Sequence, residues 1–203
     1  MVKRRLVSLV VAMLAITPCS AQTLSTHLPA ALTPSTMKIS FELDTTWHTV
    51  HGTAKDLIGK VWFKNPKDPG SIRASLSIPV SSLDTASESR DEEMRDSMDA
   101  NQFSSIQVEM PRISPSCDVR TLVVGSACAY ATNGTIRIRD VTLPIALSGD
   151  VHRDRSGALV VAGSAQLDWS KFGVKDPSIL IARVSEQVKI IFTINLPEKR
   201  DKE

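Results

Sequence analysis

The chain has 203 residues, with 24 Lys and Arg against 22 Asp and Glu, and a formal net charge of +2. Because these charges are balanced and interspersed, they form no basic patch of the kind that attracts phosphates, and we expect no nucleic-acid partner. Without its N-terminal segment the chain keeps about 180 residues, which suits one domain with a sizeable core.

The first 21 residues have the pattern of a cleaved export signal. Three basic residues at positions 3 to 5 precede an apolar run over residues 6–16, and the small residues at 19–21 suit cleavage after Ala21. The run is too short to span a bilayer, which takes about 20 residues. We therefore expect a periplasmic or secreted protein whose net charge is −1 once the three basic residues are removed. An acylated Cys19 is the less favoured alternative.

Beyond the signal, strands are predicted wherever apolar and polar residues alternate, because successive side chains of a strand point to opposite faces. Residues 22–35 show no such period and contain two prolines, so they are predicted to be a flexible leader, and 198–203 a flexible tail. The segments with the alternation are 37–43, 58–63, 72–80, 106–110, 122–124, 136–138, 141–147, 159–167 and 188–196.

Turn-forming residues separate these segments. The turn signals are Asn65 to Gly70, Asn133-Gly134 and Asp154 to Gly157. Short strands divided by such turns indicate an all-β fold, either a barrel or a sandwich.

Two segments favour helix instead. Residues 88–100 are predicted to form a short helix in which Ser89 and Glu92 make a capping box and Met94 and Met98 share one face. Aromatic residues, Gly and Pro between 168 and 180 indicate an ordered loop with a short helical turn near 169–173.

Two cysteines remain after signal cleavage, Cys117 and Cys128. Disulfides persist in exported proteins, and a hairpin could bring the two together, so we predict a bridge, with two separate thiols as the alternative. A bridge over so short a loop stabilises a fold by about 3 kcal/mol in the chain-entropy model. Neither the cysteines nor His48 and His51, which point to opposite faces of a strand, have the spacing of a metal site, so we expect no metal.

A series of short motifs along the chain resembles one known family. The segments that carry the resemblance are Phe41-Glu42-Leu43-Asp44, His48 to Thr53, Ser82-Leu83-Asp84-Thr85, Arg90-Asp91 with Met94, Gly134 to Ile145 with its Val141-Thr142-Leu143-Pro144, Phe172-Gly173-Val174-Lys175-Asp176-Pro177, and the strand 188–196. In order and spacing, over residues 36–197, they resemble the YceI-like family of polyisoprenoid-binding proteins.

The resemblance implies an antiparallel, lipocalin-like β-barrel of about eight strands whose interior binds an elongated isoprenoid or quinone-type lipid. An eight-stranded barrel is wide enough either to fill with its own side chains or to hold one ligand. The residues expected to line the cavity, the last few near its mouth, are Phe41, Leu76, Ile78, Ile106, Val108, Ile138, Ile145, Val161, Ile190, Phe192, Met94, Met98, Trp169 and Phe172. Each is also a candidate for ordinary core packing.

Arg90 and Asp91 have two interpretations: they contact a lipid head group, or they tie the helix to a strand end. No nucleophile elbow or phosphate-binding loop is present, so we expect a non-enzymatic protein without a cofactor, acting as a monomer or homodimer. A transient contact with a membrane or with a membrane electron-transfer partner fits this function. The alternatives are a structural, stress-response or partner-binding barrel without lipid, or a hydrolase or isomerase using Asp91 or Asp176.

Overall fold

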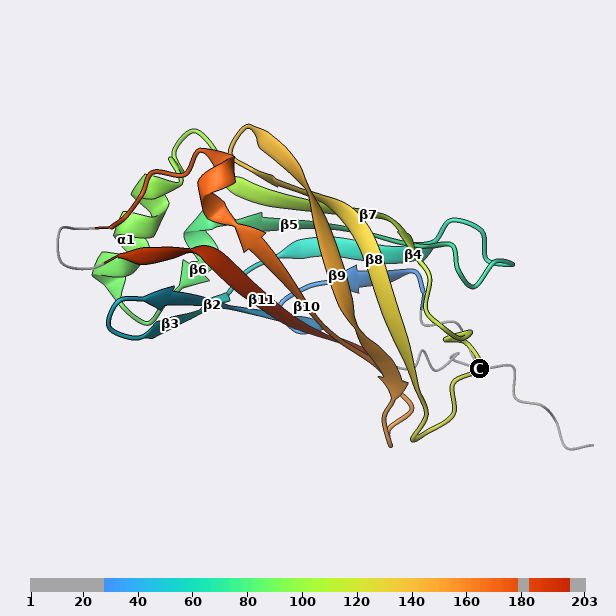
Figure 1. The fold of residues 1–203 in the computed structure, drawn as a ribbon. Helices are drawn as coiled ribbons and strands as arrows, with labels where there is room; N and C mark the ends of the chain where they lie inside the picture. Colours follow the sequence, from blue (N-terminus) through green and yellow to red (C-terminus); the bar gives the residue numbers. More distant parts are fainter. Residues whose placement is uncertain (1–27, 179–182, 198–203) are drawn as a thin grey trace, which may run out of the picture.

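The computed structural model describes residues 28–178 and 183–197. The expected export signal at 1–21, residues 22–27 of the expected leader and the expected tail at 198–203 lie outside the described residues. The described part is a single antiparallel sheet that curls on itself, with one helix at one end (Figure 1). Its inward side chains form an apolar core.

The described residues contain eleven strands. They are β1 (Ala30–Leu32), β2 (Met37–Thr45), β3 (Thr49–Ala54), β4 (Ile58–Phe63), β5 (Ile72–Pro79), β6 (Leu83–Asp84), β7 (Ser105–Ile113), β8 (Ala127–Ile138), β9 (Val141–Arg153), β10 (Leu159–Asp168) and β11 (Val184–Leu196). The all-β antiparallel class is confirmed. The count exceeds eight partly because β1 and β6, with three and two residues, are too short to show a period.

Short edge strands bring the two edges of the sheet together. The strand order is β1-β4-β5-β7-β8-β9-β10-β11-β2-β3-β6. Strand β1 pairs with β4 and then leads through a turn at residues 33–36 into β2, which lies far along the sheet. In the same way β6 pairs with β3 but follows β5 through the 3-10 turn η1 (Val80–Ser82). Each edge is therefore covalently continuous with a strand from the other side.

One end of the barrel carries helix α1 (Glu88–Ser97) and the 3-10 turn η2 (Trp169–Phe172). The backbone N–H of Lys175 donates to the carbonyl of Ser97 at 3.0 Å, which joins the segment after η2 to the end of the helix. The helical turn near 169–173 is confirmed. It ends at Gly173, whose φ of 66° suits a residue without a Cβ.

Helix α1 is shorter than the predicted span of 88–100 because its C-cap is Met98 and the next residue has a positive φ of 54°. The predicted Ser89–Glu92 capping box is wrong, since the N-cap is Ser87 and makes no side-chain capping bond. Asp91 fixes the first turn instead by accepting hydrogen bonds from Thr85.

Two other predicted elements are wrong. The predicted turn at Asn133-Gly134 lies inside β8, where inward residues alternate without a break. A Cβ at Gly134 would overlap the side chain of Met110 on the neighbouring strand, so this glycine serves a close approach and not a turn. The predicted strand at 122–124 is a loop with one isolated bridge between Val124 and Arg153.

The leader prediction fails where the structure describes it. Residues Ala30–Leu32 form β1, and Leu32 is among the most completely buried side chains of the described residues. The strand exists because it pairs with β4, a partner about thirty residues away. Such a long-range contact leaves no local period in the sequence.

Candidate ligand-binding cavity

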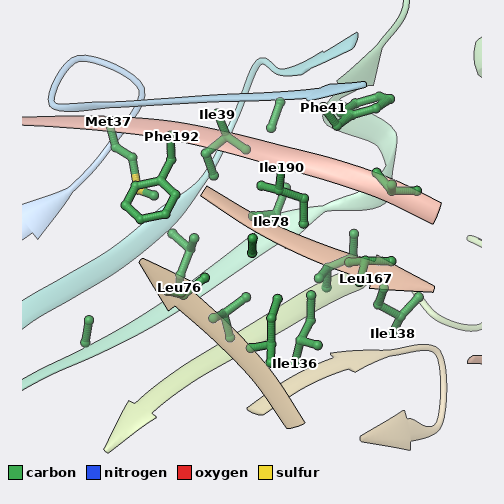
Figure 2. Close-up of a pocket in the computed structure, with 18 of the residues that line it drawn as sticks. Met37, Ile39, Phe41, Leu76, Ile78, Ile136, Ile138, Leu167, Ile190 and Phe192 are labelled. Carbon is green, nitrogen blue, oxygen red and sulfur yellow. The ribbon is translucent and has the colours of Figure 1, made fainter. Parts of the chain in front are cut away.

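The interior of the barrel contains a cavity of about 420 Å³ that is lined almost entirely by apolar side chains. Each of the eleven strands contributes at least one lining residue. Figure 2 shows Met37 and Ile39 of β2, Ile78 of β5, and Ile190 and Phe192 of β11 pointing into one shared space. The volume lies within the range of about 300–1,000 Å³ that is usual for small-molecule sites.

The cavity is long and narrow. Along β11 the lining residues run from Val184 to Leu196, a distance of about 40 Å at about 3.3 Å per residue. Barrel strands tilt by about 35–45°, so this corresponds to about 30 Å along the barrel axis. A volume of about 420 Å³ spread over such a length fits one extended chain better than a compact molecule.

Several inward side chains remain only half-buried although they point away from solvent. Phe41, Leu76, Ile106 and Ile190 all line the cavity and are of this kind. The Phe41 ring lies over its β3 partner Gly52, where a Cβ would overlap it. The half-buried inward faces show that these side chains leave the interior hollow.

Of the fourteen side chains predicted to line a cavity, thirteen do so. These are Phe41, Leu76, Ile78, Met94, Met98, Ile106, Val108, Ile138, Ile145, Val161, Trp169, Ile190 and Phe192. Phe172 does not: it is 2 % exposed and packs in a buried cluster with Val80, Met98 and Ile138. Because Phe172 lies in η2, its side chain packs in this cluster and does not reach the lumen.

The sequence prediction missed other lining residues, among them Tyr130 and Thr132 on β8. Their alternation was obscured because the inward positions of β8 include a Thr and a Gly. The Tyr130 hydroxyl donates to the carbonyl of Ala162 at 3.3 Å, and the Thr132 hydroxyl donates to the carbonyl of Arg112. Burial, with the charge of Asp150, raises the pKa of Tyr130 to about 12, so the phenol stays neutral.

Polar lining residues gather at the end of the barrel that carries α1. We call this end of the barrel the open end. The residues are Thr45, Thr85, Arg90, Glu93 and Ser97. Arg90 and Glu93 are exposed, and Thr45 and Met94 are half-buried, so the lining reaches solvent here. The described residues around the cavity carry no other charged side chain than this Arg and Glu.

Arg90 and Asp91 both bind Thr85, the residue after β6. The Asp91 carboxylate accepts from the Thr85 backbone N–H at 2.8 Å and from its hydroxyl at 2.6 Å. Arg90 donates from Nη2 to the Thr85 carbonyl at 2.9 Å and from Nε to the hydroxyl at 3.3 Å. Burial raises the pKa of Asp91, but the Thr85 hydrogen bonds and the charges of Arg95 and Lys55 outweigh it and lower that pKa. The pair therefore ties the helix to the strand end, and Arg90 alone also lines the cavity.

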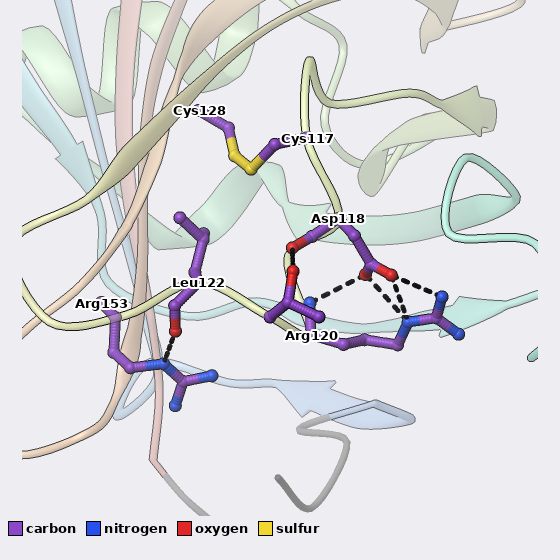
Figure 3. The surroundings of a disulfide bond; sticks show 7 residues. Cys117, Asp118, Arg120, Leu122, Cys128 and Arg153 are labelled. Atoms are coloured by element: carbon purple, nitrogen blue, oxygen red, sulfur yellow. Dashed lines mark hydrogen bonds and ion pairs between the residues drawn. A yellow bond between two sulfur atoms is a disulfide. The ribbon is translucent and has the colours of Figure 1, made fainter.

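The opposite end of the barrel, which we call the closed end, is plugged by the loop at 114–126. Cys117 and Cys128 form a disulfide with a Cα–Cα distance of 5.8 Å, and it anchors this loop to β8 (Figure 3). Val119 and Leu122 of the loop are both buried in the core cluster. Arg153 is buried and donates from Nε to the Leu122 carbonyl at 2.6 Å, which ties the loop to the end of β9 (Figure 3).

Arg120 of the same loop is ion-paired with Asp118 and also links the loop to the neighbouring β4–β5 connection. Arg120 and Asp118 are 2.6 Å apart, and hydrogen bonding by Arg120 lowers the pKa of Asp118 (Figure 3). Arg120 also donates from Nη1 to the carbonyl of Pro66 at 2.6 Å. Covalent, apolar and ionic contacts thus act together at this end.

The described residues hold no group of three or more His, Cys, Asp or Glu side chains placed to bind a metal. His51 lies 3.7 Å from Glu42 on the outside of the barrel. Within the described part of the chain, no helix combines the length and apolarity needed to cross a membrane.

Comparison with known proteins gives one family and a set of similar folds. The model of the YceI-like domain matches residues 31–196, and no curated protein sequence matches the chain. A polyisoprenoid binding domain from Saccharophagus degradans, implicated in plant cell wall breakdown, superposes with a TM-score of 0.66 at 16 % identity, covering 84 % of this chain and 99 % of that one.

Two further solved structures have the same fold. BcnA of Burkholderia cenocepacia superposes with a TM-score of 0.63 at 20 % identity over 78 % of this chain and 95 % of that chain. The YCEI protein of Campylobacter jejuni gives a TM-score of 0.55 at 17 % identity over 74 % and 86 %. At these identities the likeness concerns the fold alone.

Proposed function

This chain belongs to the YceI-like domain family, and from that premise we propose that it is an exported, non-enzymatic protein that binds one elongated isoprenoid or quinone-type lipid inside its barrel. The observation that carries the proposal is the long apolar cavity of about 420 Å³. The Saccharophagus degradans relative, named as a polyisoprenoid binding domain, supports the choice of lipid class.

The lining favours a ligand whose affinity comes from its tail. Burial of apolar surface contributes about 0.8 kcal/mol per CH2 group, so one five-carbon prenyl unit contributes up to about 4 kcal/mol before the cost of ordering the chain. The deep polar groups of Tyr130 and Thr132 already donate to backbone carbonyls. Affinity should therefore rise with the number of prenyl units until the cavity is filled.

The open end is the place for the head group. Arg90 and Glu93 offer a donor and an acceptor of opposite charge beside Thr45. A neutral carbonyl head group can accept a hydrogen bond from the guanidinium of Arg90. A neutral hydroxyl head group can in addition donate to the carboxylate of Glu93. A ring carbonyl of a quinone or a terminal alcohol of an isoprenoid has this chemistry.

Narrowing the lumen tests the proposal. Ile78→Trp adds a large ring to a buried lining position, so it should abolish uptake of a prenyl quinone, measured by native mass spectrometry, while circular dichroism shows an intact barrel. Val123→Trp adds a similar ring at an exposed loop position and serves as the control, with wild-type uptake expected. Uptake by Ile78→Trp equal to that of the control would place the ligand outside the cavity.

We also propose that the protein acts in the periplasm or is secreted, after removal of residues 1–21. The support is the basic, apolar and small-residue order of that segment. N-terminal sequencing of the mature protein should begin at Gln22. A mature chain that keeps its first residue would contradict export by this signal.

A further inference from the structure

The hairpin between β2 and β3 carries an exposed tryptophan. Trp47 is 69 % exposed, whereas Trp62 is half-buried and Trp169 is buried with its indole N–H donating to Ser185 at 2.6 Å. Transfer of an indole out of water is favourable, so an exposed tryptophan on a fixed loop is a candidate contact residue. Trp47 therefore differs from the other two tryptophans of the chain.

The tip that carries Trp47 is held in one conformation. The Thr45 hydroxyl donates to the His48 carbonyl at 2.7 Å and accepts from the backbone N–H groups of Trp47 and His48 at 3.3 and 3.2 Å. The backbone of Thr46 donates to the Arg183 carbonyl at 3.0 Å, which fixes the tip to the start of β11. Much of the entropy of ordering this loop is thus already lost before any contact forms.

The tip lies at the open end of the cavity. Thr45 lines the cavity and pairs with Val184, another lining residue, so Thr45 lies at the rim. Trp47 is two residues further along the chain. The other large apolar side chains that are strongly exposed among the described residues lie elsewhere, with Ile58 on the wall and Val123 and Val124 at the closed end.

The turn that carries Trp47 has no acidic side chain to repel lipid phosphates, since residues 45–49 include no Asp or Glu. The segment 45–55 contains no Asp or Glu; of its basic side chains, Lys55 pairs with Asp84 at 2.9 Å, His51 lies 3.7 Å from Glu42, and His48 lies next to Trp47. Asp44, which precedes the turn, accepts a hydrogen bond from the Thr49 hydroxyl at 2.6 Å. Lipid phosphates therefore meet no acidic residue in the tip itself.

We propose that Trp47 is the contact through which the open end of the barrel docks on a phospholipid bilayer. Tryptophan prefers the interface between head groups and acyl chains, where its ring is buried and its N–H stays hydrogen-bonded. Docking at this residue places the rim of the cavity against the bilayer, so that a lipid enters without crossing water. The role in loading rests on the proposed lipid cargo; the contact with the bilayer does not.

The first experiment measures loading of the full mature protein from phosphatidylcholine vesicles that contain a fluorescent prenyl quinone. Trp47→Ala should load about tenfold more slowly than wild type, Trp47→Phe should recover part of the rate, and Val123→Ala at the closed end should load normally. Affinity for quinone added without vesicles should be the same in all four proteins. Equal loading rates for Trp47→Ala and wild type would overturn the inference while leaving the cargo in place.

The second experiment needs no cargo. Vesicles of brominated phosphatidylcholine should quench the tryptophan emission of wild type. Trp47→Phe should lose that quenching, because Trp169, although at the open end, is only 9 % exposed and Trp62 lies next to the β4–β5 connection near the closed end. Absence of quenching in wild type at saturating vesicle concentration would overturn the bilayer contact. Quenching without any quinone uptake would keep the contact and defeat the proposed cargo.

Discussion

The two ends of the barrel are closed by different physical means. At the closed end a disulfide, buried Val119 and Leu122 and the buried Arg153 fix a loop into the core. At the open end a short helix is tied to the barrel through hydrogen bonds to Thr85, and half-buried apolar side chains face a hollow. The closed end is thus held by a covalent bond and a buried loop, whereas at the open end the cavity lining reaches solvent beside a tethered helix.

Two phenylalanines near the open end differ in their surroundings, because Phe172 packs in a filled cluster and Phe41 lines the cavity. Substitution of Phe172 should have the largest effect on stability. Phe172→Ala should lower the free energy of unfolding by about 3–5 kcal/mol because it leaves a void in a filled cluster. Phe41→Ala should lower it by only about 1–2 kcal/mol, since one side of that ring already faces the cavity. Urea denaturation of both variants measures the difference.

Ligand binding should show the reverse order. Phe41→Ala is expected to weaken the affinity for a prenyl quinone, whereas folded Phe172→Ala should keep it because Phe172 lies outside the lining. Equal losses of stability in the two variants would show that the lumen around Phe41 is as tightly filled as the cluster around Phe172.

Removal of the disulfide tests the closed end. The bridge closes a loop with a sequence separation of 11, so the double variant Cys117→Ser/Cys128→Ser should lose about 3 kcal/mol of unfolding free energy. The same change should appear in wild type after reduction, and reductant should leave the double variant unaffected. A double variant as stable as oxidised wild type would show that the apolar plug alone closes this end.

A smaller loss is expected from the tether at the open end. Asp91→Asn keeps the size of the side chain but weakens two charge-assisted hydrogen bonds from Thr85, at an expected cost of about 1–3 kcal/mol. Glu92→Gln is the control, because Glu92 is an exposed neighbour on the same helix. Equal stability of the two variants would mean that the tether does not hold the helix.

The smallest effect is the pH dependence of that tether. Because the pKa of Asp91 is lower in the folded protein than its ordinary 3.8, its ionised form stabilises the fold fully above pH about 5, and the contribution is lost as pH falls through the folded pKa. The stability difference between wild type and Asp91→Asn should therefore shrink below pH 4. A difference that stays constant down to pH 2 would exclude this origin.

The sequence predicts the fold where the signal is local. Alternation predicted the inward faces of β2, β5 and β11, and the spacing of Met94 and Met98 predicted which side of the helix faces the lumen. β1 was missed because its partner is distant, and most of β8 because Thr132 and Gly134 occupy inward positions.

The emptiness of the interior is a property that no local pattern carries. Phe41 and Phe172 look alike as apolar residues in the sequence, yet one lines a hollow and the other fills a cluster. The distinction depends on which neighbour each ring meets, Gly52 in one case and a set of large side chains in the other. Three-dimensional packing decides it.

Native mass spectrometry of protein purified without detergent is the most direct test of a lipid inside the barrel. The predicted result is a mass increment of one lipid molecule per chain that organic extraction identifies as an isoprenoid or prenyl quinone, present in wild type and in Val123→Trp but absent in Ile78→Trp. Protein that is recovered without lipid and takes up no prenyl quinone offered to it would contradict the account.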